Sequence, residues 1–177
     1  CRGIWLDWMA QGTRVSQNLL HDNGPSEDLF MEVNHGPALI DNNIMLSGNS
    51  LLVNSQGEAY VHNIMAGRIR VLKGEGRLTP HLEEHSTVVA GLANNKSGDE
   101  RFYNNIFSGE ANLGAYDGAV LPIWKDGNVY LNGAKPGREE AYPLILEDFN
   151  PSYKITEEAD GWYLELKTDK DWINSQG

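Results

Sequence analysis

Two acids, Asp7 and Glu32, are the side chains whose type and spacing are best suited to catalysis. Each follows a short apolar stretch, GIWL before Asp7 and DLFM before Glu32. The two acids lie 25 residues apart, which is also the separation of Asn18 and Asn43. We therefore expect both acids at the same position of a repeating unit.

Adjacent parallel strands would bring these carboxyl groups to a distance that suits glycoside hydrolysis. Such strands lie about 4.8 Å apart. Retaining glycosidases hold their two carboxyls about 5 to 5.5 Å apart, whereas inverting enzymes need roughly 6.5 to 9.5 Å. Two carboxylates so close cannot both ionise cheaply, so one is expected to keep its proton and act as the donor. Two other interpretations stay open here, because stacked acids can also bind a cation or be inert surface groups.

An internal repeat supports this alignment. Asn followed by two apolar residues recurs at Asn18, Asn43, Asn63 and Asn105, with separations of 25, 20 and 42 residues. Short apolar strands with Gly and Asn turns at such periods are typical of solenoids. The pattern predicts an all-β protein, a right-handed parallel β-helix in which the asparagines are turn and ladder residues.

The character of the sequence changes along the chain. Parallel β-helix rungs are predicted for residues 1–115, with a long loop at about 74–100 that can build a binding site. Alternating apolar residues with DGN and DG turns predict a C-terminal antiparallel, sandwich-like segment over 116–177, with Trp124, Trp162 and Tyr163 in its core. Because the chain begins without Met, directly on a motif-rich strand, we expect a piece of a longer protein.

Charge and composition exclude several classes of partner. The chain carries 25 acidic and 14 basic residues, a formal charge of -11, which repels phosphate backbones and anionic lipids. Neither nucleic acid nor a membrane is therefore an expected partner. Neutral glycans are compatible with that charge, and the five Trp and seven Tyr suit their binding. Cys1 alone cannot form an internal disulfide, and His21, His62 and His81 lack the spacing of metal ligands.

The longer motifs resemble those of glycoside hydrolase family 120, β-xylosidases built on a parallel β-helix. The stretches WLDWMAQGTR and MEVNHGP carry the resemblance, and TPHLEEHSTVVAGL and DERFYNNIFSG extend it to about Gly109. The family is retaining, and its motifs place the nucleophile on Asp7 and the general acid/base on Glu32. The resemblance implies xylo-oligosaccharides or other pentosides as substrate, and neither a cofactor nor a catalytic metal.

Family members are much longer, with further rungs and a second domain before the WLDW motif. We expect the open edge of the first rung to be covered by another copy of the chain or by that missing N-terminal part. Any export signal would lie there too, so the sequence leaves the compartment open, as it does a bound calcium ion.

Residues close to the acids are candidates for binding sugar hydroxyls. They are Trp8, Gln11, Asn34, His35 and His85. Asn34 shares the face of Glu32 by the period of a strand. His35 can instead orient Glu32 or cap a turn, and His85 in the long loop is otherwise merely exposed. Trp5 is expected in the interior, and Trp8 on either side.

Two functions compete with the β-xylosidase interpretation. One is a non-catalytic carbohydrate-binding or surface β-helix module that keeps the acids without an enclosed subsite. The other is an α-L-arabinofuranosidase, which also acts on a pentoside. Hydrolysis of aryl glycosides separates the first from an enzyme, and a panel of pentosides tests the second.

Overall fold

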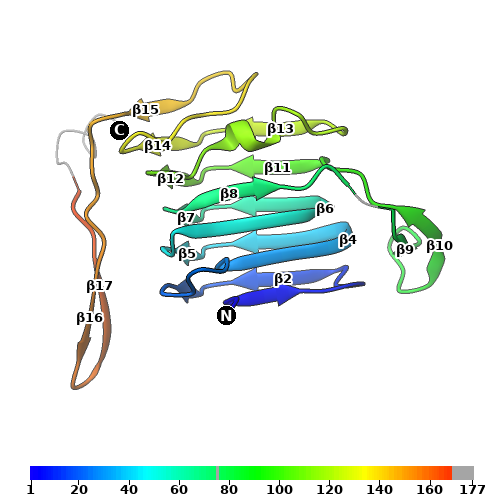
Figure 1. Ribbon diagram of the computed structural model, residues 1–177, viewed down its shortest axis with the longest axis horizontal. Helices are drawn as coiled ribbons and strands as arrows, with labels where there is room; N and C mark the ends of the chain where they lie inside the picture. The colour runs from blue at the N-terminus through cyan, green and yellow to red at the C-terminus, as the bar shows by residue number, and fades with distance from the viewer. Residues whose placement is uncertain (75, 169–177) are drawn as a thin grey trace.

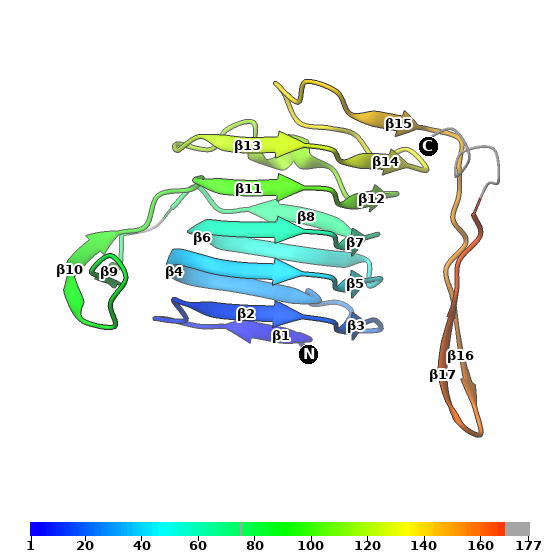
Figure 2. The same ribbon diagram turned by 180° about the vertical axis from the view of Figure 1, so that it is seen from behind.

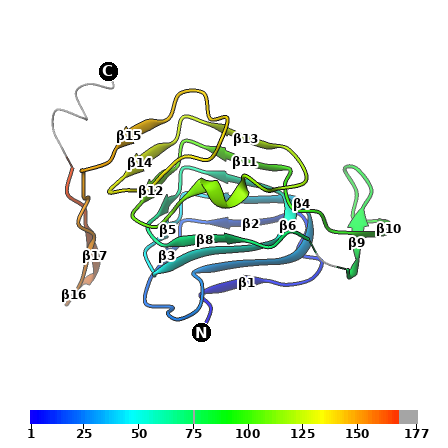
Figure 3. The ribbon, with the colours of Figure 1, turned by 45° about the horizontal axis from the view of Figure 1, so that its top comes forward.

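The computed structural model describes residues 1–74 and 76–168, and most of them form a parallel β-helix (Figure 1). The chain winds in successive rungs that contribute strands to three faces (Figure 3). The predicted parallel β-helix is confirmed. No helix in the described residues is long and apolar enough to cross a membrane.

On each face, a strand pairs in parallel with its counterparts on the neighbouring rungs. The first face holds β1 (Ile4–Leu6), the first half of β4 (Leu29–Asp41), the first half of β6 (Asn49–Val61) and β8 (Arg68–Val71). The second face holds β2 (Thr13–Ser16), the second halves of β4 and β6, β11 (Glu100–Tyr103) and β13 (Ile123–Asp126). The third face holds β3 (Leu19–Leu20), β5 (Ile44–Met45), β7 (Ile64–Met65), β12 (Ile106–Ser108), β14 (Val129–Leu131) and β15 (Leu144–Leu146).

The edge between the first and second faces is where β4 and β6 bend. Each of these strands is 13 residues long, and the register between them shifts around His35. Val33 has a φ of 48°, which is unfavourable for a β-branched residue. Glu32 precedes Val33 and pairs with Asn54 on the next rung. We call this edge, with Asp7, Glu32 and Asn54 on successive rungs, the acid corner.

The four asparagines of the sequence repeat form one continuous ladder, which Asn128 extends. Each side-chain Nδ2 donates to the Oδ1 of the next asparagine, at 2.9 Å for Asn18 to Asn43 and 3.1 Å for Asn105 to Asn128. Asn63 joins the two halves with bonds of 3.0 Å on either side. Each ladder residue follows one with a positive φ, namely Gln17, Asn42, His62, Asn104 or Gly127. The predicted ladder is confirmed.

Two glutamates, Glu58 and Glu100, are fully buried in the core on neighbouring rungs. They are adjacent in register, because the residues that follow them pair as Ala59 with Arg101. Burial raises the pKa of both carboxyls, and the proximity of Glu58 raises that of Glu100 further. Because of these shifts, both acids keep their protons at neutral pH. Nearby, Tyr60 stacks on the core ring of Phe102 with 4.7 Å between centroids.

The parallel solenoid continues past the boundary predicted at residues 115/116. β13 pairs in parallel with β11, β14 with β12, and β15 with β14. The predicted antiparallel segment over 116–177 is therefore wrong in extent. Antiparallel pairing in the described C-terminal part is confined to β16 (Lys154–Glu158) and β17 (Gly161–Glu165), and residues 169–177 lie outside the description. A solenoid strand also alternates apolar and polar residues, so alternation alone could not separate the two arrangements.

The aromatic residues assigned to a C-terminal core lie on the surface instead. Trp162 and Tyr163 on β17 are 60% and 49% exposed. Trp124 on β13 is 40% exposed, and the Arg101 guanidinium lies 4.4 Å from the centre of its ring. A two-stranded hairpin has no second layer against which such rings could be buried.

The long loop predicted at 74–100 contains an antiparallel hairpin, which we call the flap. It consists of β9 (Leu78–Leu82) and β10 (Val89–Asn94). The flap takes the place of the acid-corner connection between β8 and β11 and hangs beside the earlier rungs (Figures 1 and 2). On the following rung, the short 3-10 helix η1 (Leu113–Tyr116) replaces a strand of the first face and packs on β8.

Candidate active site

Strand pairing aligns Asp7 and Glu32 at the acid corner. β1 pairs with β4 in register up to Leu6 opposite Met31, and the two acids are the next residue on each chain segment. The alignment of the two segments predicted from the sequence is confirmed. The separation of the carboxyl groups stays a prediction, for which the spacing of neighbouring strands gives about 5 Å.

Asp7 lies just beyond the end of β1, at the start of a tight turn. Its Oδ1 accepts a hydrogen bond from the Trp8 backbone N–H at 2.7 Å, and its carbonyl accepts one from Ala10 at 3.2 Å. Met9 within this turn has a φ of 68°. Because the Asp7 side chain is exposed, an external molecule can reach its second carboxylate oxygen.

Glu32 lies within β4 and is engaged by the flap. Arg77, directly before β9, donates from Nη2 to Glu32 Oε1 at 2.8 Å. The Glu32 side chain keeps 17% of its surface exposed. Arg77 could not be identified from the sequence, because only the entry of the flap at the acid corner brings this residue to Glu32.

Asn34 ties the two acid-bearing segments together through its side-chain amide. Nδ2 donates to the carbonyls of Leu6 at 3.0 Å and Glu32 at 2.9 Å, and Oδ1 accepts from Ala10 N–H at 2.7 Å. The residue is 1% exposed. Both amide hydrogens are thus used inside the protein, and neither is left to donate to a sugar hydroxyl as predicted.

Gln11 and His35 attach the flap to the first two rungs. The Gln11 amide donates to the Pro80 carbonyl at 2.7 Å and accepts from Leu82 N–H at 3.1 Å. A neighbouring β-strand would form the same pair of hydrogen bonds with β9. His35 is 8% exposed, and its Nε2 lies 3.2 Å from the Ala93 carbonyl. Both residues also line the pocket described below, and their contacts with sugar stay a prediction.

The tryptophans near Asp7 and the loop histidine, which the sequence singled out, are all exposed to solvent. Trp8 is 52% exposed beside Asp7, in a position open to a ligand. Trp5, expected in the interior, is 49% exposed and stacks on Phe30 at 5.8 Å. That expectation is wrong because Ile4 and Leu6 take the inward positions of β1. His85 lies in the exposed connection between β9 and β10, where its role stays a prediction.

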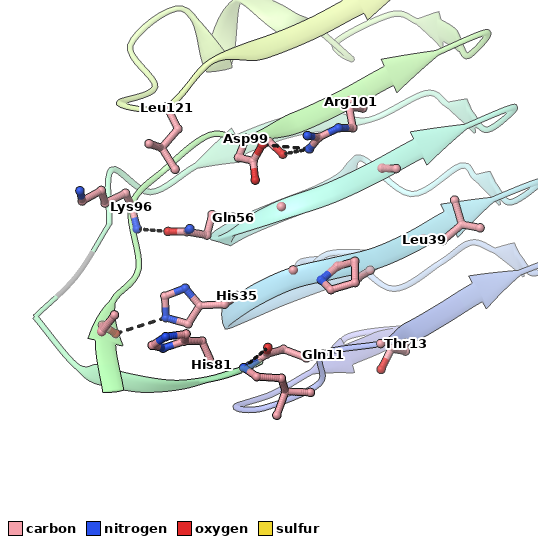
Figure 4. Close-up of a pocket in the computed structure, with 18 of the residues that line it drawn as sticks. Gln11, Thr13, His35, Leu39, Gln56, His81, Lys96, Asp99, Arg101 and Leu121 are labelled. Carbon is pink, nitrogen blue, oxygen red and sulfur yellow. Dashed lines mark hydrogen bonds and ion pairs between the residues drawn. The ribbon is translucent and has the colours of Figure 1, made fainter. Parts of the chain in front are cut away.

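A pocket of about 920 Å³ lies between the flap and the outer surface of the second face (Figure 4). The residues that line it include Gln11 and His35, on the two rungs that carry the acids, and Arg101 on β11. Neither acid belongs to the lining. Within residues 1–74 and 76–168, no three His, Cys, Asp or Glu residues gather in a way that could hold a metal ion.

Comparison with known proteins relates nearly the whole chain to one solved structure. No protein-family model and no curated protein sequence matches the chain. The structure of XylC in complex with xylose matches it with a TM-score of 0.89 and 38% sequence identity. The match covers 98% of this chain and 31% of the XylC chain, so this chain spans about a third of that protein's length. The chain is therefore similar, in sequence and in structure, to one part of XylC, which has been solved with xylose bound.

Proposed function

We propose that this chain carries the two catalytic acids of a retaining β-xylosidase, which removes xylose from the non-reducing end of xylo-oligosaccharides. The observation that carries the proposal is the pairing of β1 with β4, which aligns Asp7 and Glu32 on adjacent rungs. The similarity to XylC, solved with xylose, supports a pentose as the sugar. The double-displacement reaction of two carboxylates needs no cofactor.

In the first step, an Asp7 carboxylate oxygen attacks the anomeric carbon while Glu32 gives its proton to the leaving glycosidic oxygen. The bond to the leaving group breaks as the ester to Asp7 forms. In the second step, Glu32 takes a proton from water, whose oxygen attacks the same carbon and releases Asp7. The Trp8 N–H on Asp7 Oδ1 leaves Oδ2 for the attack.

Arg77 and Asn34 bear on how Glu32 performs both steps. Arg77 occupies Glu32 Oε1, so substrate binding has to displace the guanidinium before that oxygen can reach a leaving group. Asn34 bonds the backbone on both acid-bearing segments and so holds the spacing of the carboxyls. Holding two catalytic groups at a fixed separation accounts for a large part of the rate enhancement that such a site provides.

The experiment that tests the proposal is hydrolysis of an aryl β-xyloside by the parent chain and two variants. Asp7→Ala should abolish turnover without loss of folding. Glu32→Ala should still release a good leaving group in the first step and accept azide as external nucleophile in the second, yielding the β-xylosyl azide. Asp22→Ala, whose side chain is 92% exposed, is the matched control and should retain the parent rate. Absence of azide rescue would count against Glu32 as acid/base.

A second candidate function is a carbohydrate-binding module without hydrolysis. It is favoured by one observation, namely that neither acid lines the pocket beside the flap while Glu32 is held by Arg77. A parent chain that binds xylose oligomers and leaves every aryl pentoside intact would establish this alternative. Including aryl α-L-arabinofuranoside in the same panel tests the competing pentose specificity.

A further inference from the structure

We propose that the pocket between the flap and the second face binds a neutral segment of a pentose oligosaccharide, at a place separate from the two acids. The proposal rests on the proposed function for the identity of the sugar. The pocket itself is defined by the flap, by three rungs of the solenoid and by β11 (Figure 4).

The floor of the pocket is hollow because successive rungs approach too closely there to carry side chains. A Cβ on Gly36 would lie 2.1 Å from the Gly57 carbonyl oxygen. Beside these glycines, Pro37, Leu39 and Ala59 present a small apolar surface. An apolar floor with polar groups around it is the usual construction of a small-molecule site, and it suits the C–H face of a sugar ring.

The wall formed by the flap is held in place by side chains from three rungs. Gln11 and His35 bond the flap strands as described above, and Gln56 Oε1 accepts from Lys96 N–H at 2.7 Å just after β10. Each of these three side chains also lines the pocket. The cavity is therefore formed before a ligand arrives, which reduces the entropy lost on binding.

Both arginines that line the pocket are paired with acids, and Lys96 is the remaining basic residue of the lining; the other polar groups suit a neutral ligand with many hydroxyls. Arg14 donates to Asp41 at 2.7 and 2.6 Å, and these bonds hold the pKa of Asp41 at about 2. Arg101 lies 3.0 Å from Asp99. Pairs fixed in this way present donors and acceptors with little net charge. An anionic ligand would also meet the formal charge of -11 on the whole chain.

The volume of the pocket and its position near the two acids suit a substrate longer than one sugar. The volume of about 920 Å³ lies at the upper end of the roughly 300 to 1,000 Å³ typical of small-molecule pockets. Gln11 follows Asp7 by four residues, and His35 follows Glu32 by three. A sugar segment held here would thus anchor an oligosaccharide on the same two rungs that carry the acids.

The test fills the pocket and measures xylotriose binding by calorimetry, with Asp7→Asn in every protein to prevent hydrolysis. Leu39→Trp places a large ring over the floor and should weaken binding about tenfold or more. Leu19→Trp is the matched control, because both leucines lie on strands and are 37% exposed, and it should keep the parent affinity. Ala59→Trp, adjacent to Leu39 on the next rung, is a second filling variant should the first misfold.

Several outcomes would overturn the proposal. Unchanged xylotriose affinity in a folded filling variant is one, and absence of xylotriose binding by the parent is another. Binding of glucuronate in place of xylotriose would show an anion site instead. Failure of the proposed function appears separately, as lack of aryl β-xyloside hydrolysis by the chain with Asp7 intact, and leaves the binding result readable.

Discussion

Replacing both Glu58 and Glu100 by Gln is expected to remove a loss of stability that the protein undergoes as the pH rises above about 5. Burial raises the pKa of both carboxyls in the folded chain. In the unfolded chain they titrate near the ordinary glutamate value of about 4.3. Above that value the unfolded state therefore binds fewer protons than the folded state, so the free energy of unfolding falls with rising pH.

The magnitude follows from the number of protons involved. One proton kept by the folded state alone costs about 1.4 kcal/mol of stability per pH unit, and two cost about 2.7 kcal/mol per unit. The fall continues until the pH passes the raised pKa of each group, which is about 8 for Glu58. Gln has a similar shape and does not titrate, so the double variant lacks this slope.

Urea unfolding at several pH values between about 5 and 8, followed by tryptophan fluorescence, measures the effect. The difference in unfolding free energy between the double variant and the parent should grow in favour of the variant as the pH rises. Other shifted groups, such as Asp28, whose pKa is raised by burial, are common to both proteins and cancel in the difference. Glu157→Gln with Glu158→Gln, on exposed residues of β16, is the control. A difference that does not change with pH would refute the reasoning.

Three further changes test the acid corner and the ladder. Asn34→Asp removes two donated bonds at a buried position, and should lower kcat far more than it changes KM and cost roughly 2 to 3 kcal/mol of stability in urea unfolding; an unchanged kcat would contradict the positioning role. Arg77→Ala removes the guanidinium that substrate has to displace from Glu32, so kcat/KM for an aryl β-xyloside should rise, and an unchanged kcat/KM would show that the ion pair has no bearing on catalysis. Asn63→Ala breaks the ladder on both sides and should destabilise the protein by roughly 3 kcal/mol, clearly more than Asn18→Ala at its end; equal losses in denaturation midpoints would argue against a cooperative ladder.

The features that the sequence reveals are those set by the repeat itself. The ladder requires an amide at one corner of every rung, so Asn18, Asn43 and Asn63 recur visibly. The equal spacing of the acids and of the first two asparagines likewise predicts that Asp7 and Glu32 align, because an insertion or deletion between an acid and the asparagine of its own rung would make the two spacings unequal. Asn128 belongs to the ladder, but its DGN context is also that of a hairpin turn, which hid it from the pattern.

The contacts that the sequence does not reveal are those between a rung and the flap. Gln11 and His35 are placed near the acids by the motif, yet their bonds go to flap residues about 60 or 70 positions later in the chain. No periodic pattern specifies which face of an inserted hairpin meets the solenoid. Arg77 escaped prediction for the same reason. The extent of the parallel sheet beyond residue 116 was missed because alternating apolar and polar residues suit both parallel and antiparallel strands.

The manner in which the flap enters the solenoid has a consequence for how specificity can diversify. β8 and β11 still pair with β6 on either side of the insertion, so the rung that carries the flap keeps both of these strands. Lengthening such an excursion costs only loop-closure entropy, about 0.6 kcal/mol for each doubling. The rungs that carry the acids can therefore remain fixed while the flap is exchanged, and chimeras with flaps of different length offer a route to altered preference for chain length.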